Sequence, residues 1–281
     1  MVVNKITQVL GEPYFQTDNC FIYHLECSSA MAKLPDEFIN LTVTSPPYNI
    51  GKDYEKNLPI DEYLSWCNIW LSEIYRITLN TGAFWLNLGY LSIPNRAKAI
   101  PIPYLIWDKI PFYLIQEIVW NYGAGVAGKK FFSPRNEKFL WYVKNSDNYT
   151  FNLDEVRDPN VKYPNQKKNG KLKVNPKGKN PTDVWQFPKV IAKNRAAKER
   201  TPHPAQFPIA VISRIIQACS NPNEIVFDPF LGSGTTAVVP LSLKRQFIGF
   251  EIRADYCEIA ANRIENLLRE KQVDAEQLSL F

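Results

Sequence analysis

No run of apolar residues in this chain of 281 is long enough to cross a membrane. A membrane-spanning helix needs about 20 mostly apolar residues, and the N-terminal MVVNKITQVL lacks the apolar region and cleavage site of a signal peptide. The five cysteines are scattered, with no CxxC spacing of the zinc or redox type. We therefore expect no membrane contact, no metal site and a reducing, cytoplasmic setting.

Acidic residues are scarce in one segment. Between Arg157 and Arg200 there are 13 Lys/Arg and 3 Asp/Glu, whereas the rest of the chain has 20 basic and 25 acidic residues. A basic segment on an otherwise acidic protein favours a polyanionic partner such as nucleic acid. A lysine-rich loop that is merely exposed to solvent is the alternative interpretation.

Short apolar runs alternate with segments of helical spacing along most of the chain. The apolar runs predict seven strands, at 21–25, 41–43, 83–88, 112–120, 137–143, 224–228 and 246–251. The helical spacing predicts helices at 28–34, 61–79, 206–219, 235–243 and 254–270. This alternation is typical of a parallel sheet covered on both faces. The segment from about 144 to 198, rich in Asn, Lys and Pro, interrupts it and suits an inserted surface subdomain or a loop.

The stretch SPPY, residues 45–48, follows one of these apolar runs. Pro46 and Pro47 fix their φ angles and have no N–H to donate, and each proline restricts the residue before it. Ser45 and Tyr48 are therefore expected to be held in one geometry before any ligand binds. A turn that simply ends a strand is the alternative.

A second stretch, IVFDPFLGSGTT at 225–236, has neither the GxGxxG pattern nor the lysine of a phosphate-binding loop. It nevertheless places Asp228 at the end of a strand, and Gly232 and Gly234 before a helix, where a ligand can approach the backbone closely. Glu251 ends the next strand, 23 residues after Asp228, and is placed to accept hydrogen bonds from ribose hydroxyls. The pattern favours a nucleoside ligand without a pyrophosphate, with purely structural glycines as the alternative.

Together the two stretches resemble those of the DNA methyltransferases that modify exocyclic amino groups using S-adenosylmethionine. The resemblance covers most of the chain outside about 145–195 and is carried by LTVTSPPYNIG, GAFWLNLG, NEKFLWYVK, HPAQFP, FDPFLGSGTT and GFEI. Because SPPY precedes the glycine loop, residues 229–234, the order resembles that of the β group. The resemblance implies an α/β, Rossmann-like fold with a mostly parallel seven-stranded sheet and a circularly permuted motif order. It also implies three regions: a catalytic half at 1–144, a target-recognition insertion at 145–198 and a cofactor-binding half at 199–281.

The resemblance also implies a catalytic role for each residue of SPPY. The hydroxyl of Ser45 and the carbonyl of Pro46 would accept hydrogen bonds from the target amine, so that its lone pair can attack a methyl group. Pro47 would keep this corner rigid. Tyr48 would stack on a base extruded from the duplex, which helps to offset the cost of flipping it.

Binding sites for cofactor and DNA are implied in the same way. Glu251 would bind the ribose of S-adenosylmethionine and Glu26 would lie near its adenine. His203 would lie near the methionine carboxylate, or would instead cap a helix that begins at Gln206. The expected contacts of the methionine part are Asp228, Phe230, Gly232, Ser233, Gly234 and Thr235. The expected DNA contacts in the basic segment are Lys167, Lys168, Lys171 and Lys173.

The resemblance implies a specific reaction, methylation of cytosine N4 in duplex DNA after base flipping. Ser at the first position of SPPY is commoner among N4-cytosine enzymes, while N6-adenine methylation is the alternative. No cysteine follows a proline, which argues against C5-cytosine methylation through a covalent intermediate. Methylation of a protein or RNA amide and DNA binding without catalysis are further hypotheses. A partner restriction endonuclease, and a monomer or homodimer, are compatible with this group.

Overall fold

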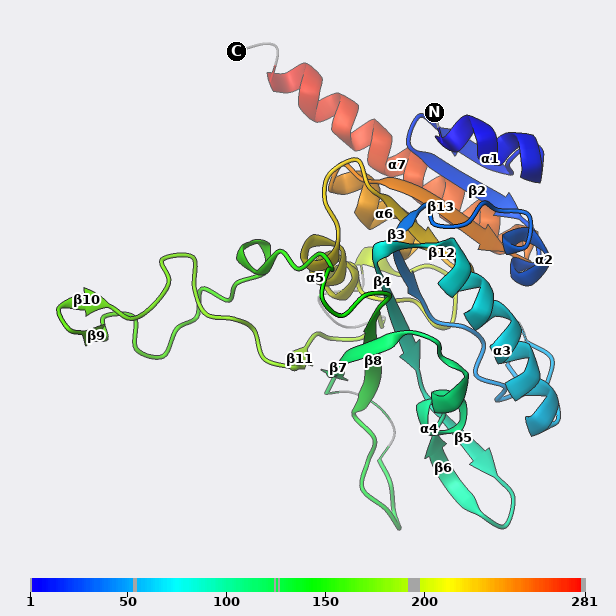
Figure 1. The fold of residues 1–281 in the computed structure, drawn as a ribbon, viewed down its shortest axis with the longest axis horizontal. Coiled ribbons are helices and arrows are strands. Elements are labelled where there is room, and N and C mark those ends of the chain that lie inside the picture. Colours follow the sequence, from blue (N-terminus) through cyan, green and yellow to red (C-terminus); the bar gives the residue numbers. More distant parts are fainter. Residues whose placement is uncertain (1, 53–54, 124, 126, 192–197, 279–281) are drawn as a thin grey trace.

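A central sheet of nine strands carries helices on both faces in the computed structural model (Figure 1). The structure describes residues 2–52, 55–123, 125, 127–191 and 198–278. The order across the sheet is β1 (Phe15–Thr17), β2 (Cys20–His24), β13 (Gln246–Glu251), β12 (Ile225–Asp228), β3 (Ile39–Thr44), β4 (Thr78–Leu88), β8 (Asn136–Val143), β7 (Tyr113–Asn121) and β11 (Val184–Gln186).

The seven strands predicted from the sequence are all present, and the sheet is mostly parallel as expected. Five of its eight neighbouring pairs are parallel: β2–β13, β13–β12, β12–β3, β3–β4 and β7–β11. The two strands beyond the expected seven are the short edge strands β1 and β11. Both are only three residues long, so neither leaves a clear alternating pattern in the sequence.

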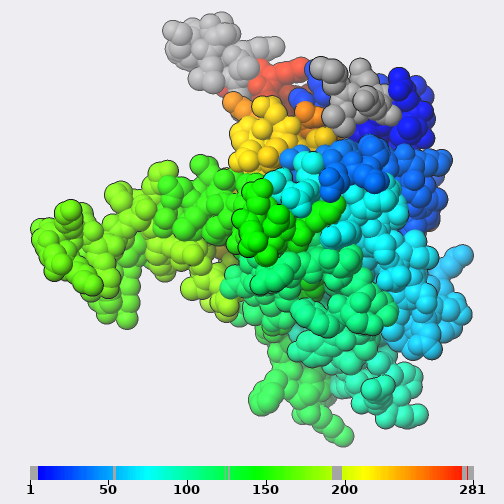
Figure 2. Space-filling view, in the orientation of Figure 1, coloured from blue at the N-terminus to red at the C-terminus, as the bar shows by residue number. Residues whose placement is uncertain are grey.

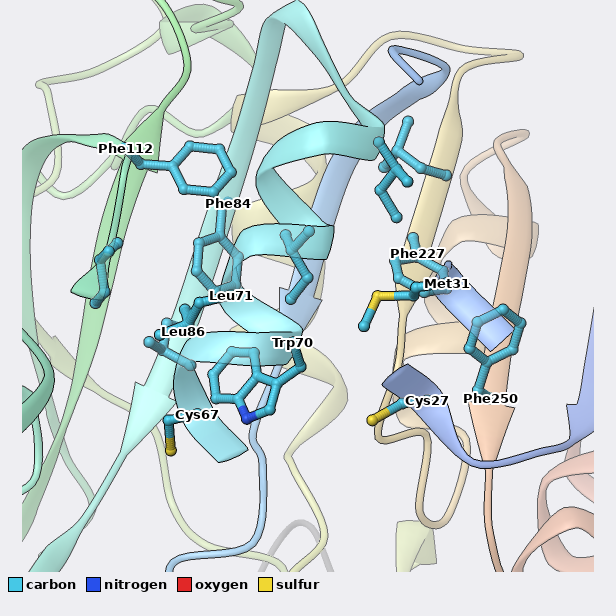
Figure 3. Close-up of a cluster of buried hydrophobic side chains, with 14 of the residues drawn as sticks. Cys27, Met31, Cys67, Trp70, Leu71, Phe84, Leu86, Phe112, Phe227 and Phe250 are labelled. Atoms are coloured by element: carbon cyan, nitrogen blue, oxygen red, sulfur yellow. The ribbon is translucent and has the colours of Figure 1, made fainter. Parts of the chain in front are cut away.

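One face of the sheet packs against the helices that follow β2, β3 and β6. These helices are α2 (Cys27–Met31), α3 (Ile60–Ile77) and α4 (Pro103–Ile106). The apolar positions of α3 recur every three or four residues, and Cys67, Trp70 and Ile74 are fully buried. Figure 3 shows this core, to which α3 contributes Trp70, β4 contributes Phe84 and β12 contributes Phe227. Helix α1 (Val2–Leu10) reaches the same core through Ile6.

The opposite face packs against three helices from the last quarter of the chain. They are α5 (Ile209–Cys219), α6 (Thr235–Ser242) and α7 (Ala254–Leu278). Successive residues of a strand point to opposite faces, so Val226 of β12 joins this second core while Phe227 joins the first. The carboxyl ends of the parallel strands therefore meet along one edge, which is where ligands bind in open α/β sheets.

Several details differ from the sequence-based expectations. Helix α5 begins at Ile209, not Gln206, because Pro208 has an extended conformation with φ −67° and ψ 138°, and a residue before proline disfavours the helical region. Helix α1 was not predicted. Nor was the hairpin of β5 (Tyr90–Ile93) and β6 (Ala97–Pro101).

The basic segment leaves the body of the protein as a long arm (Figures 1 and 2). Its tip is a hairpin of β9 (Lys167–Lys168) and β10 (Lys171–Leu172), and the chain returns to the sheet at β11. Trp185 of β11 is buried in the second core, so β11 is part of the main fold. No helix among the described residues is both long enough and apolar enough to cross a membrane.

Candidate active site

A cavity of about 900 Å³ opens at the carboxyl ends of the parallel strands. Residues from both halves of the chain line it, since β13 and β12 lie between β2 on one side and β3 and β4 on the other. Of the 13 catalytic and cofactor-binding residues predicted from the sequence, Gly234 alone lies outside the lining. The 12 that line it are Glu26, Ser45, Pro46, Pro47, Tyr48, His203, Asp228, Phe230, Gly232, Ser233, Thr235 and Glu251.

The SPPY corner follows β3 and is held by hydrogen bonds at both ends. The hydroxyl of Tyr63 in α3 donates to the Pro47 carbonyl at 2.9 Å. The hydroxyls of Ser45 and Tyr48 lie 3.0 Å apart. The Tyr48 ring packs on Gly89, where an added Cβ would lie 2.6 Å from a ring carbon. The corner is therefore fixed by its neighbours as well as by its prolines.

Asn87, near the end of β4, is a site residue that sequence reasoning missed. Its Oδ1 accepts a hydrogen bond from the Tyr48 hydroxyl at 2.7 Å and a longer one from the Ser45 hydroxyl at 3.4 Å. Its Nδ2 donates to the Lys138 carbonyl of β8 at 2.9 Å. The side chain is fully buried yet lines the cavity. The sequence feature that could have identified Asn87 is its position as a single amide inside the apolar strand GAFWLNLG.

The chain after the corner folds around two polar side chains. Asn49 has a left-handed φ of 61° and exchanges two hydrogen bonds with the backbone of Leu58, at 2.6 and 2.8 Å. Glu55 accepts hydrogen bonds from the backbone N–H groups of Asn49, Ile50 and Lys52. These bonds hold the wall of the cavity that follows Tyr48.

Asp228 connects the two halves of the site. Its carboxylate accepts hydrogen bonds from Thr44 of β3 at 2.6 Å, from the Phe230 N–H at 2.9 Å and from Thr236 of α6. It is 2% exposed, and burial raises its pKa to about 6. Among the described residues, no ion pair neutralises it. A buried carboxylate without a cation is suited to bind one.

The glycine loop brings backbone N–H groups to the cavity. Gly232 has a left-handed φ of 53°, and its N–H donates to Glu251 Oε2 at 2.8 Å. The other carboxylate oxygen of Glu251 accepts from the Arg253 N–H at 2.9 Å. Burial raises the pKa of Glu251, although these backbone hydrogen bonds lower it. Each oxygen of Glu251 keeps acceptor capacity toward the cavity.

Helix α7 supports the glycine loop from behind. Gly234 has a φ of 77° and packs so closely on Ala260 that an added Cβ would lie 2.6 Å from the Ala260 Cβ. Arg263 donates to the carbonyl of Ser233 at 2.6 Å and to the hydroxyl of Thr235 at 3.0 Å. Burial lowers the pKa of Arg263 to about 10, which leaves it charged at neutral pH. Gly234 and Arg263 thus shape the loop from outside the cavity.

Glu26 lies two residues after the end of β2, on the same edge. It is the N-terminal cap of α2, and its carboxylate accepts from the N–H groups of Ser28 and Ser29 at 2.9 and 2.8 Å. Burial alone would raise the pKa of Glu26, but these hydrogen bonds outweigh it and hold the pKa below its usual range. Glu26 is therefore ionised at neutral pH.

His203 lies against the glycine loop and does not cap a helix, so the capping alternative is wrong. The N–H of Ile209 at the start of α5 donates instead to Glu199 at 2.8 Å. The His203 ring contacts Tyr256 at 4.5 Å between centroids, and a Cβ on Gly232 would lie 2.9 Å from its Nε2. Burial, followed by the charges of Arg263 and Arg253, lowers the pKa of His203 to about 4. The ring is neutral at physiological pH.

A charged pair lies on the wall formed by β8 and the segment after β11. Lys189 Nζ is 3.1 Å from Glu137 Oε1 and 3.7 Å from the centroid of the Tyr122 ring. Lys189, Glu137 and Trp120 line the cavity together with Ser45. This region combines a flat aromatic ring with groups that donate and accept hydrogen bonds.

The four lysines predicted to contact DNA lie at the tip of the arm (Figure 1), and none of them lines the cavity. They are exposed, and none belongs to the ion pairs found among the described residues. Other basic residues nearer the body are paired, as Lys177 is with Asp154 and Lys179 with Asp158. Within the described part of the chain, no group of three or more His, Cys, Asp or Glu side chains is arranged to hold a metal.

Comparison with known proteins gives consistent matches. The family described as DNA methylase (N6_N4_Mtase) matches residues 39–262. The Type II methyltransferase M.ScaI of Streptomyces caespitosus is 60% identical over 98% of this chain and 88% of its own. The DNA adenine methyltransferase YhdJ of Escherichia coli K12 is 33% identical over 87% of this chain and 82% of its own. Among solved structures, the cytosine-N4-specific PvuII DNA methyltransferase aligns with a TM-score of 0.71 at 19% identity, covering 92% of this chain and 93% of that one.

Proposed function

The chain belongs to the DNA methylase family and is a DNA amino-methyltransferase, and from this premise we propose that it methylates cytosine N4 in duplex DNA with S-adenosylmethionine as donor. The observation that carries the proposal is one cavity that joins the SPPY corner to the glycine loop and its acidic residues. N4 is preferred because Ser45 opens the corner, in keeping with the resemblance to N4-cytosine enzymes.

The residues of the cavity fit S-adenosylmethionine. The buried carboxylate of Asp228 has no cationic partner among the described ion pairs, and the ammonium group of the methionine part would supply one. Glu251 keeps acceptor capacity for ribose hydroxyls, and Glu26 lies one strand further along the same edge, where the adenine would bind. When bound, this cofactor supplies a methyl group on a positively charged sulfur.

Ser45 and the Pro46 carbonyl would hold the target amine. Asn87 donates through Nδ2 to a backbone carbonyl, so its Oδ1 must face the two hydroxyls and accept from them. The proton of Ser45 then points into the protein, and its lone pairs are left for an N–H of the amine. A fixed acceptor at this position is electrostatic preorganisation. It favours the pyramidal form of the amine nitrogen, in which the lone pair can point at the methyl carbon.

In the proposed transfer the amine nitrogen bonds to the methyl carbon as the carbon–sulfur bond breaks, and the nitrogen then loses one proton to water. Reaching a base inside a duplex requires flipping it out, at a cost of a few kcal/mol. One side of the Tyr48 ring packs on Gly89, and we expect the base to stack on the other. Such stacking is worth about 1–3 kcal/mol and offsets much of that cost.

The division into a catalytic half, an arm for target recognition and a cofactor half is part of the proposal. The arm carries exposed basic residues away from the body (Figure 2), where they can reach phosphates on either side of a bound site. We also propose a restriction endonuclease of matching specificity as partner, because the relative from Streptomyces caespitosus is named a Type II methyltransferase. Protection of DNA by the purified methyltransferase against a co-encoded nuclease would test this partner.

The reaction is tested by incubating the purified protein with methyl-labelled S-adenosylmethionine and DNA from a host without DNA methylation. The DNA is then digested to nucleosides and analysed by mass spectrometry. We expect N4-methyldeoxycytidine. N6-methyldeoxyadenosine in its place would show that the base is wrong and the enzyme class right, whereas label in protein or RNA alone would overturn the proposal.

Two variants separate the proposed roles within the site. Ser45→Ala should lower turnover far more than cofactor affinity, because it removes an acceptor for the reacting amine. Glu251→Ala should weaken cofactor binding first, because it removes the acceptor for ribose and a partner of the Gly232 N–H. Calorimetric titration with S-adenosylmethionine, alongside turnover, distinguishes the two. Equal losses of both quantities in Ser45→Ala would contradict its assigned role.

A further inference from the structure

The loop between β7 and β8 exposes a phenylalanine completely. The side chain of Phe132 is 101% exposed, the highest value among the large apolar residues that the structure describes, while its neighbour Phe131 is 49% exposed. An exposed ring at the tip of a loop costs solubility and contributes nothing to the core. The ring of Phe132 is therefore accessible to a binding partner.

The tip of this loop has a defined conformation. The N–H of Gly128 donates to the Ser133 hydroxyl at 2.9 Å, which closes the turn. The Phe131 ring packs on Gly128, where a Cβ would lie 3.1 Å from a ring carbon, and the ammonium of Lys98 in β6 lies 4.3 Å from the centre of the same ring. One phenylalanine thus anchors the turn, and the anchored turn presents the other to solvent.

The charged residues in this loop and in the neighbouring hairpin segment are all basic. The loop at 122–135 and the hairpin segment at 89–102 together contain Arg96, Lys98, Lys129, Lys130 and Arg135, and no Asp or Glu. Lys129 and Lys130 are exposed, and neither takes part in the ion pairs found among the described residues. An apolar ring between cations suits a nucleic-acid duplex, in which stacked bases lie between two rows of phosphates.

The loop leaves the sheet at the edge where the cavity opens. Trp120 and Glu137, which precede and follow it, both line the cavity. Figures 1 and 2 show this loop and the β5–β6 hairpin projecting from the same end of the molecule, clear of the arm. A duplex that delivers a nucleobase into the cavity would pass close to the point where this loop leaves the sheet.

We propose that Phe132 is a wedge that enters the DNA stack beside the extruded nucleotide, with Lys129 and Lys130 binding the flanking phosphates. An apolar side chain inserted between base steps occupies space that unstacking opens, and so favours the flipped state. This role rests on the proposed function, because only an enzyme that acts on an extruded base has such a gap to fill.

The test compares Phe132→Ala with Phe132→Trp and with Tyr104→Ala, a control at another exposed aromatic residue, 73% exposed in α4. Sites methylated by the wild-type protein in plasmid DNA are mapped first, and a short duplex carrying one site is used for binding and turnover. Phe132→Ala should lower duplex affinity about 10-fold with an unchanged salt dependence, since it removes stacking and no charge. Phe132→Trp should retain affinity, and the Tyr104 control should match the wild type.

Two further measurements give the wedge its specific signature. Lys129→Gln with Lys130→Gln should weaken binding and make the salt slope shallower, by up to about 0.9 for each phosphate that the lysines no longer neutralise. A mismatch at the target base lowers the cost of flipping, so Phe132→Ala should lose less on a mismatched duplex than on a matched one. Equal losses on both duplexes, or no loss on either, would overturn the wedge. A wild-type protein that methylates no DNA would instead overturn the proposed function.

Discussion

Asn87 is the side chain through which β4 and β8 set the geometry of the SPPY corner. It is buried, and its amide has partners on both sides, Lys138 on one and the hydroxyls of Ser45 and Tyr48 on the other. We predict that Asn87→Leu, which keeps the volume and removes both polar groups, lowers turnover by about 10-fold or more. Cofactor affinity should hardly change, because Asn87 contacts none of the proposed cofactor residues. Turnover measured alongside calorimetric titration gives the result.

Tyr48→Phe is the matched control for this change. It removes one hydroxyl of the same network and keeps the ring that we expect to stack on the base. It should therefore lose less turnover than Asn87→Leu. A larger loss in Tyr48→Phe would show that the tyrosine hydroxyl, and not Asn87, positions Ser45.

Asp228 makes the stability of the cofactor-free protein depend on pH. Burial raises its pKa from 3.8 to about 6, so between these values the folded state binds more protons than the unfolded chain. This contribution to stability is present at about pH 4 and is lost as the pH rises past 6, a difference of about 2–3 kcal/mol. We predict that Asp228→Asn raises the melting temperature at pH 8 more than at pH 5, while weakening cofactor binding.

Thermal unfolding at the two pH values, without cofactor, tests the effect of Asp228. The amide can keep the hydrogen bonds of the carboxylate, because the hydroxyls of Thr44 and Thr236 can each donate or accept. A variant that is less stable than the wild type by the same amount at both pH values would show that the buried charge has no net cost.

Among the elements, the glycine loop depends on its backbone shape and on the ring above it. Gly232 combines a φ of 53° with a close approach in which a Cβ would lie 2.9 Å from His203 Nε2. Gly232→Ala should therefore cost about 1–2 kcal/mol of backbone strain and should also displace His203. We predict at least a 10-fold loss of cofactor affinity, which corresponds to about 1.4 kcal/mol of binding free energy.

Gly11→Ala isolates the strain from the effect on His203. Gly11 has a φ of 84°, and nothing lies within 4 Å of where its Cβ would be. It should lower the melting temperature and leave cofactor affinity unchanged. Equal cofactor affinity in the two variants would mean that the His203 ring is not part of the site.

The elements that follow from local patterns were predictable, and those that depend on long-range contacts were not. The seven predicted strands of the central sheet follow from apolar runs, and α3 follows from the spacing of its buried residues. Helix α5 was placed three residues early, because Gln206 binds the backbone of Glu199 and Thr201 and so belongs to a loop. Asn87 lies 39 residues from Tyr48 in sequence, and no spacing rule connects the two.

We expect the lysines of the arm to contribute most to the salt dependence of DNA affinity. Replacing Lys167, Lys168, Lys171 and Lys173 by Gln should weaken duplex binding, with the salt slope shallower by up to about 0.9 for each phosphate left without its lysine. Lys177 and Lys179 form the matched control, since Asp154 and Asp158 already neutralise them. Binding measured over a range of salt concentrations that shows no change in slope would make the arm tip a solvated loop.

Across the whole molecule, the two halves of the chain form one sheet. Strands β13 and β12 of the second half lie between β2 and β3 of the first, and the buried hydrogen bond from Thr44 to Asp228 joins the halves at the site. The cavity is complete only when both halves are in place, because the SPPY corner comes from one and the glycine loop from the other. The circularly permuted order of the motifs therefore leaves the geometry of the site intact.

This arrangement predicts the outcome of cutting the chain in the arm. Exposed loop tips are preferred sites of proteolysis, so brief trypsin treatment should cut first among the lysines of β9 and β10 (Figure 1). The fragments should elute together in size-exclusion chromatography, because separating them would expose both faces of β12 and β13. The nicked protein should bind S-adenosylmethionine as the intact one does and bind DNA more weakly. Fragments that separate without denaturant would show that the paired strands do not hold the halves together.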